Sequence, residues 1–223
     1  MAQRPIFIAD KGKGHFVDEA MLSIQWNAGF AESQKKKNIE ALHRAASVYA
    51  PDVRVLEIST KSSNELGRAL SAFNLSFQLP DENWTKVECA YQGSKVFERG
   101  GPFSDLYRAR PLEAKRDMRL LECGKLVGFE FFGQKWDLQP QTAFYDWLYI
   151  QALHQSEWAH DILSFDGFTD IEFNPKKSFN CQARAVAMYV GIVKRYGKID
   201  FSPEVFTEYY GIAVRNGHQM QLI

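Results

Sequence analysis

Four polar side chains in the first half of the chain could carry out chemistry together. They occur at positions i, i+3, i+4 and i+7 and are Glu88, Tyr91, Gln92 and Lys95. Residues with this spacing share one face of a helix. Glu88 and Lys95 would then lie about 10 Å apart along the helix axis, so both long side chains could reach one bound group. A carboxylate, an amide and an amine in one line could together form a small catalytic site, so we call these four residues the catalytic row. The other interpretation is a solvated helix face.

The preceding segment is expected to position this row. Apolar residues there alternate with polar ones, which is the period of a half-buried strand. The apolar members are Phe73, Leu75, Phe77 and Leu79. Residues 80–83 are rich in turn formers and interrupt the pattern, and the helical period begins at Val87. The sequence therefore predicts a strand, a loop and a helix that runs from Val87 through Lys95.

Length and composition fit a single domain, or one domain with a small extension. The chain has 223 residues, of which 45% are hydrophobic, and this is ample for a sizeable core. No apolar run approaches the ~20 residues that span a bilayer, and the first residues lack the pattern of a signal peptide. Helices of unequal length and the absence of a GxGxxG fingerprint favour an α+β fold over a doubly wound one.

Charge and cysteine usage narrow the function classes. The formal net charge is zero, so any contact with nucleic acid must come from a local patch, and a repressor or architectural protein is disfavoured. The three cysteines form no CxxC pair, which suggests reduced thiols and a cytoplasmic location. The five histidines follow no ligand pattern, so no metal and no other cofactor is expected.

The best candidate for such a local patch surrounds Pro111, which is well placed as the first residue of a helix that runs to about Leu121. Basic residues outnumber acidic ones there, and they are Arg108, Arg110, Lys115, Arg116 and Arg119. They either contact a DNA backbone or are simply solvated.

The motifs around the catalytic row resemble those of a known superfamily. LSAFN, followed after a strand and loop by ExxYQxxK, is similar to the LSNFY and EHxxQAxK pattern of the NADAR superfamily of N-glycosidases. The matching residues are Leu70, Ser71, Phe73, Asn74, Glu88, Tyr91, Gln92 and Lys95. Ala72 and Cys89 depart from the pattern, where the family often has Asn and His. Three later stretches, FFGQKW, TAFYDWLYIQALHQ and GFTDIEFNPKKSFNCQAR, look like the branch encoded beside DarT-type DNA ADP-ribosyltransferase toxins.

The resemblance implies a single NADAR-like (YbiA-like) domain, mostly helical with a small sheet. Within it we expect a strand–helix–strand extension over residues 1–60, a catalytic core over 61–200, and a C-terminal helix and tail over 201–223. It also implies an antitoxin that removes ADP-ribose from guanine bases of DNA. Its partners would be ADP-ribosylated single-stranded DNA, ADP-ribose as product and a DarT-like toxin, with no membrane.

The resemblance assigns expected roles to the row. Lys95 would attack the anomeric carbon and form a Schiff base with the opened ribose, or would act only as a fixed cation while Glu88 activates water. Glu88 would move protons, stabilise positive charge or orient a hydroxyl. The remaining pocket residues would be Ser71, Asn74, Tyr91 and Gln92, with Tyr91 or Phe73 stacking on a base that is single-stranded or flipped.

A polar loop at residues 174–180 is the second candidate region. Asn180 matches an Asn that NADAR proteins have at the start of their last core helix, whereas Asn174 and Pro175 replace a common Trp-Gly. Asn174 and Asn180 could hydrogen-bond ribose hydroxyls, and Lys176 could meet a phosphate. The alternative is a turn with solvated lysines. A short strand around Ile171 is expected to precede the loop, and a helix over Cys181 to Arg195 is expected to follow it.

Two further candidates lie in an aromatic helix predicted over Ala143 to His154. Trp147 belongs to an aromatic stripe of the kind that usually packs in a core. Asp146 is either exposed or faces the pocket.

Two rival functions stay open beside the antitoxin glycohydrolase: an N-glycosidase acting on a small phosphoribosylated metabolite, and a non-catalytic antitoxin that neutralises a toxin by contact.

Overall fold

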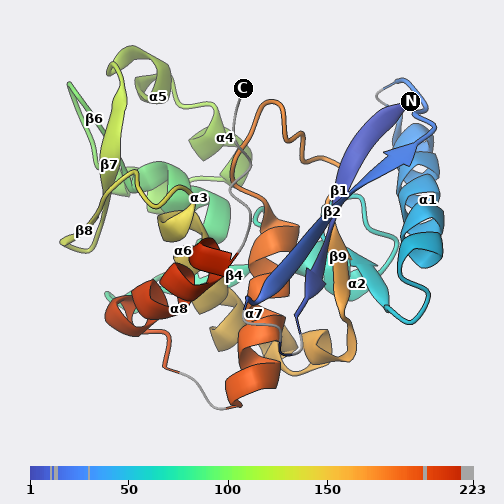
Figure 1. Cartoon of the computed structure of the whole chain (residues 1–223). Coiled ribbons are helices and arrows are strands. Elements are labelled where there is room, and N and C mark those ends of the chain that lie inside the picture. Colours follow the sequence, from blue (N-terminus) through green and yellow to red (C-terminus); the bar gives the residue numbers. More distant parts are fainter. Residues whose placement is uncertain (11, 13–14, 30, 198–199, 217–223) are drawn as a thin grey trace.

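The computed structural model has the predicted α+β fold and describes residues 1–10, 12, 15–29, 31–197 and 200–216 (Figure 1). Among these residues the largest sheet has the strand order β2–β1–β9–β3. Its strands are β1 (Ala2–Ala9), β2 (Val17–Ile24), β3 (Val55–Glu57) and β9 (Gly167–Thr169). β1 and β2 form an antiparallel hairpin, and β9 lies between β1 and β3, antiparallel to the first and parallel to the second.

Helices cover both faces of this sheet (Figure 1). α1 (Glu32–Tyr49) buries Ile39 and Leu42 in a cluster with Ile6 of β1. On the other face, α6 (Ala143–Gln155) and α7 (Gln182–Tyr196) bury most of their residues in the main core, together with Phe7 and Phe168 of the sheet. The extents of α6 and α7 confirm the helices predicted there to within one residue. Because their buried residues run almost all round, both helices lie inside the molecule.

The catalytic-row segment builds the second part of the fold. A short hairpin, β4 (Ser76–Gln78) and β5 (Trp84–Lys86), leads into α3 (Val87–Gly93). A second antiparallel sheet follows, with β6 (Lys95–Phe97), β7 (Leu126–Phe131) and β8 (Gln134–Trp136). The alternation of buried side chains at Leu75, Phe77 and Leu79 is as expected, although only residues 76–78 find a strand partner.

The predicted continuation of α3 to Lys95 is wrong. The helix begins at Val87 as expected but ends at Gly93, with Ser94 as its C-cap, and Lys95 is the first residue of β6. Long-range hydrogen bonds end the helix, because the carbonyl of Gly93 accepts from the N–H of Phe103 (2.7 Å) and that of Ser94 from the N–H of Glu130 (2.8 Å). Lys95 then pairs with Phe129 across the sheet.

Other boundaries also differ from the prediction. The helix expected over Pro111 to Leu121 is two short helices, α4 (Pro111–Lys115) and α5 (Arg119–Glu122), separated by residues 116–118. The strand expected around Ile171 lies instead at β9, and Ile171 follows it in a turn. α2 (Glu65–Ala69) precedes the LSAFN turn, and α8 (Pro203–Asn216) follows α7. The predicted C-terminal tail, residues 217–223, lies outside the described residues.

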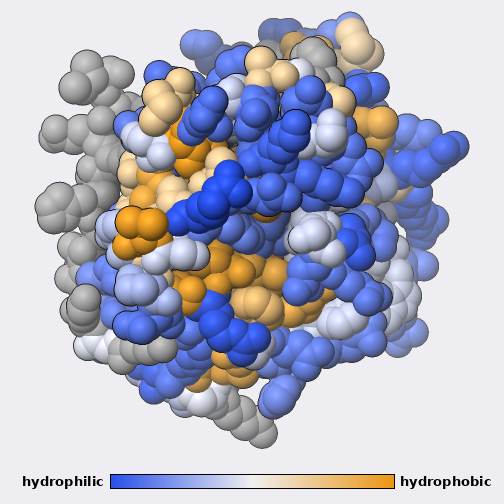
Figure 2. Space-filling view, turned by 90° about the vertical axis from the view of Figure 1, so that its right-hand side faces the viewer, coloured by the Kyte–Doolittle hydropathy of each residue, from blue (hydrophilic) through white to orange (hydrophobic). Residues whose placement is uncertain are grey.

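The surface is mainly hydrophilic. On the side of the molecule shown in Figure 2, hydrophilic residues surround a hydrophobic area near the centre of the face. In the part of the chain that the structure describes, no helix combines the length and the hydropathy needed to cross a membrane.

Candidate active site

A cavity of 560 Å³ brings the NADAR-like motifs together. This volume lies within the range of about 300–1,000 Å³ that is usual for ligand sites. Six of the candidate residues line it, namely Ser71, Phe73, Glu88, Tyr91, Gln92 and Asn180. Residues 137–145, before and in α6, also line the cavity. The other lining residues are Ala72, Lys115, Leu126, Phe129, Asp170, Glu172, Phe173, Ser178, Phe179 and Gln182.

α3 supplies the polar wall of this cavity. Gln92 donates through Nε2 to Oε1 of Glu88 (2.9 Å), and both side chains are buried. A carboxylate can only accept from an amide nitrogen, so this bond fixes which way the Gln92 amide points. Its Oε1 is buried and has no hydrogen-bond partner among the described residues. Glu88 also lies 3.9 Å from the ammonium nitrogen of Lys115.

Lys95 lies beside this wall and not in the lining itself. Its ammonium nitrogen is 4.8 Å from the centroid of the Tyr91 ring, and Tyr91 lines the cavity. The pKa of Lys95 is lowered to about 8, chiefly by burial; the charge of Glu88 opposes this shift and the charge of Lys115 adds to it. The amine therefore has a substantial neutral fraction near physiological pH, as a nucleophilic lysine needs.

The LSAFN turn is attached to both α3 and α7. The Ala72 carbonyl accepts from the N–H of Glu88 (3.0 Å), and its N–H donates to Oε1 of Gln182 (2.8 Å). Phe73 lies beneath Lys115, with the ammonium nitrogen 5.1 Å from its ring centroid. The turn thus presents Ser71 and Phe73 to the cavity beside the α3 row.

Asn180 and Tyr91 meet across the cavity wall. Asn180 donates through Nδ2 to the Tyr91 hydroxyl at 2.6 Å. Burial raises the pKa of Tyr91, so the phenol stays neutral. The ring of Tyr91 contacts Phe129 and, edge to face, Tyr145. These contacts hold the ring that lies under the Lys95 amine.

Five other candidates are held elsewhere. Asn74 donates to the Arg68 carbonyl (2.8 Å), and Asn174 accepts from the N–H of Lys176 (3.1 Å), so each asparagine braces its own turn. Lys176 is exposed and does not line the cavity. Asp146 is buried in an ion pair with Arg184 of α7, and Trp147 donates from its indole nitrogen to the Phe201 carbonyl (3.1 Å) in the core.

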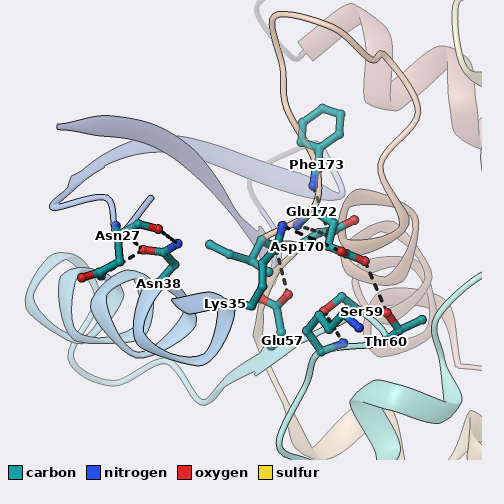
Figure 3. A network of polar contacts seen from close by, with 11 residues as sticks. Asn27, Lys35, Asn38, Glu57, Ser59, Thr60, Asp170, Glu172 and Phe173 are labelled. Atoms are coloured by element: carbon teal, nitrogen blue, oxygen red, sulfur yellow. Dashed lines mark hydrogen bonds and ion pairs between the residues drawn. The ribbon is translucent and has the colours of Figure 1, made fainter. Parts of the chain in front are cut away.

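Several lining residues were not singled out from the sequence, and Asp170, Glu172 and Tyr145 carry the most chemistry. Asp170 directly follows β9, where residues at strand ends commonly meet a site, and this was the available signal. Lys115 was assigned only to a basic patch. Figure 3 shows Asp170 and Glu172 above Glu57 of β3, a carboxylate from a segment more than a hundred residues earlier.

Ion pairs partly neutralise the basic patch that the sequence predicted around Pro111. Arg119 is ion-paired with Asp105 (2.7 Å) and Asp117 (2.9 Å), and Arg110 with Glu113 (3.2 Å). Lys115 faces Glu88, while Arg108 and Arg116 are exposed. Within the described residues, no three His, Cys, Asp or Glu side chains are grouped in a way that could hold a metal ion.

The cavity can therefore bind a polar ligand between an acid, an amine of lowered pKa and several aromatic rings. Comparison with curated protein sequences gives no match. A family model described as the DarT1-associated NADAR antitoxin matches residues 2–218. Since that match spans almost the whole sequence, the chain belongs to the family of DarT1-associated NADAR antitoxins.

Proposed function

We propose that this antitoxin is an ADP-ribosyl glycohydrolase that removes ADP-ribose from guanine bases of DNA and so reverses the modification made by a DarT-like toxin. The observation that carries the proposal is the amine of Lys95, with its pKa lowered to about 8, which lies beside a cavity wall that contains Glu88 and the buried Oε1 of Gln92. The family supplies the antitoxin role, and the cavity supplies groups suited to cleaving an N-glycosidic bond.

The reaction begins at the anomeric carbon. The neutral amine of Lys95 attacks this carbon, and the bond to the guanine nitrogen breaks with its electron pair going to that nitrogen. Opening of the ribose ring gives a Schiff base between Lys95 and the sugar. Water then adds to the same carbon and releases ADP-ribose, and the lysine amine is regenerated.

Glu88 stabilises the positive charge that develops on the sugar as the bond breaks. A nearby carboxylate alone would raise the pKa of the lysine and suppress attack. Lys115 offsets this effect, because its ammonium lies 3.9 Å from Glu88 and repels a proton on Lys95. The three residues together allow an acid and a neutral amine to serve one site.

The aromatic residues suit a base that has left its duplex stack. Phe73 lines the cavity, and Phe179, which also lines it, is half exposed. Exposed rings at such a site stack on unpaired bases with little regard for sequence. The substrate is therefore single-stranded DNA or a flipped guanine.

A time course of ADP-ribose release from an ADP-ribosylated single-stranded oligonucleotide tests the proposal. Wild type should release free ADP-ribose, and Lys95→Ala and Glu88→Ala should each slow release by at least about 100-fold. Lys125→Ala, which changes an exposed lysine, is the control and should retain wild-type activity. Borohydride added during turnover should trap ADP-ribose on wild type and not on Lys95→Ala. If activity is lost in Lys95→Ala and no adduct forms on wild type, Lys95 acts as a fixed cation.

Two outcomes would replace the proposal. If both variants still rescue cells from the toxin, the antitoxin acts by contact and not by catalysis. If purified protein cleaves a free phosphoribosylated metabolite and leaves the modified oligonucleotide intact, the substrate is the metabolite.

A further inference from the structure

A second carboxyl group faces the same cavity from the sheet side. Asp170 follows β9, lines the cavity and is 6% exposed. Its Oδ1 accepts two backbone bonds, from the N–H of Glu172 (2.9 Å) and of Phe173 (3.2 Å). Those bonds hold the carboxyl through Oδ1, and no backbone N–H of the described residues donates to Oδ2, which is therefore the oxygen to which we assign the proton.

Glu57 lies behind this carboxyl, deep in the sheet (Figure 3). It is 2% exposed and accepts from the N–H of Ile171 (2.8 Å) and from the hydroxyl of Thr169 (2.7 Å). The same Thr169 hydroxyl lies 3.1 Å from Nε2 of His43 on α1. Since the hydroxyl proton goes to Glu57, His43 must donate to Thr169, and burial lowers the pKa of His43 so that the ring is neutral.

Asp170 and Glu57 are both buried and affect each other's ionisation, and two such carboxyl groups do not both ionise readily. Burial, followed by the charge of Glu57, raises the pKa of Asp170 to about 8, although the N–H of Glu172 and the Gln182 side chain favour the charged form. Burial raises the pKa of Glu57 as well. The other titratable or charged groups that face Asp170, directly or through one contact, are Arg4 on β1, His43 and Lys35 on α1, Tyr145 and Tyr149 on α6, Cys181 before α7, and Glu172 on its own loop.

An independent observation shows that the cavity is built for a polar ligand. Oε1 of Gln92 is buried within the lining and accepts no hydrogen bond from the part of the chain that the structure describes, and its orientation is fixed by the bond from Nε2 to Glu88. An acceptor held in this way is available to a donor of a bound molecule, and leaving a buried polar atom unsatisfied costs about 1–3 kcal/mol. A sugar hydroxyl or a base amino group would supply that donor.

We infer that Asp170 is the proton donor to the guanine nitrogen that leaves the sugar, with Glu57 as the positioning residue that keeps the donor protonated. This inference rests on the proposed function. As the bond between the anomeric carbon and nitrogen breaks, the electron pair goes to nitrogen, which takes the proton from Oδ2 of Asp170. When water attacks the sugar carbon in the second half of the reaction, the Asp170 carboxylate takes a proton back from that water. The site thus uses two carboxyl groups for different tasks, with Asp170 as the proton donor and Glu88 as the group that stabilises positive charge.

Leaving-group dependence separates a proton donor from a structural residue. Asp170→Asn should slow release of ADP-ribose from the oligonucleotide by about 100- to 10,000-fold. A second substrate is ADP-ribose with a p-nitrophenyl group on the anomeric oxygen, in the same configuration. The rate at which Asp170→Asn cleaves it should be within about 10-fold of the wild-type rate, because p-nitrophenolate leaves without taking up a proton. Asp161→Asn changes an exposed acid away from the cavity and should match wild type on both substrates.

The wild-type pH profile tests the inference without relying on that variant's folding. Activity on the oligonucleotide should rise with pH as Lys95 loses its proton and fall again above about pH 8 as Asp170 loses its own. The descending limb should be absent with the nitrophenyl substrate, whereas the ascending limb should remain. In Glu57→Gln the descending limb should move to lower pH, because the charge that helps to hold the proton on Asp170 is gone.

The results distinguish the inference from the function on which it rests. The role of Asp170 would be overturned if Asp170→Asn lost equal activity on both substrates, or if the descending limb persisted with the nitrophenyl substrate. The proposed glycohydrolase function would not be affected by either result. If wild type releases no ADP-ribose from the oligonucleotide, the proposed function fails and the inference falls with it.

Discussion

The ammonium nitrogen of Lys95 lies 4.8 Å from the centroid of the Tyr91 ring, although the two residues belong to a strand and a helix that meet at a turn. The ring shields one side of the amine from water, and an aromatic face attracts the charged form only modestly. Burial is the stronger effect, and it lowers the pKa of Lys95 to about 8. The helix end at Gly93 is therefore what brings a reactive amine next to the cavity.

This lowered pKa should be visible in stability. An unfolded lysine binds its proton below about pH 10.4, and folded Lys95 does so only below about pH 8. Between these values the unfolded chain binds more protons than the folded one. The free energy of unfolding therefore decreases as pH falls from about 10.4 to 8. Lys95→Met should raise the free energy of unfolding at pH 7 by on the order of 2 kcal/mol. Urea denaturation at pH 7 and pH 10 checks this, and a difference from wild type that does not shrink at pH 10 would contradict it.

Lys115 should tune the same amine. Its charge lowers the pKa of Lys95 and balances that of Glu88. In Lys115→Met the pKa of Lys95 should rise, and the ascending limb of the pH–rate profile for ADP-ribose release should move to higher pH. Lys125→Met removes an exposed charge and serves as the control. An ascending limb in the same place for Lys115→Met and wild type would show that Lys115 does not act on Lys95.

The hydrogen bond from Asn180 to Tyr91 should couple the two residues energetically. Asn180→Ala and Tyr91→Phe should each reduce the free energy of unfolding by about 0.5–1.5 kcal/mol. The double variant should lose less than the sum of the two, because both single variants break the same 2.6 Å bond. Chemical denaturation of the four proteins measures the coupling. Strict additivity would mean that this bond adds nothing to stability.

Gly93 should tolerate no side chain. A Cβ there would lie 2.6 Å from Cε1 of Tyr107 and 2.9 Å from the carbonyl oxygen of Phe103. Gly93→Ala should therefore lower stability by about 1–3 kcal/mol through overpacking. Gly100→Ala is the matched control, since its Cβ would meet only side-chain atoms, the nearest being Sγ of Cys123 at 3.0 Å. Thermal unfolding of both variants is the measurement, and equal losses would argue against a special role for the close packing at Gly93.

Local pattern was enough to predict the helices that carry most of the site. α3, α6 and α7 begin within one residue of the expected positions, because apolar spacing and turn residues mark those starts. The buried alternation at Leu75, Phe77 and Leu79 was also correct, and only the length of the strand was not. In these places the local sequence and the tertiary packing favour the same structure.

The prediction failed where a distant segment decides the outcome. The carbonyls of Gly93 and Ser94 are taken by Phe103 and Glu130, and no local signal reveals this. Asp146 pairs with Arg184 across two helices, so its spacing on α6 did not indicate its role. Asp170 was overlooked for the same reason, because the carboxyl that perturbs it comes from β3. The roles assigned to Lys95 and Glu88 stay predictions until activity is measured.

The position of β9 between β1 and β3 has a consequence for anyone who wishes to shorten or fuse this protein. A chain that started at residue 61 would lose the hydrogen-bonding neighbours of β9 on both edges, together with the acid that lies behind Asp170. A minimal functional fragment therefore cannot be obtained by trimming the first 60 residues. Tags and fusion partners belong on other parts of the molecule, away from the opening hairpin.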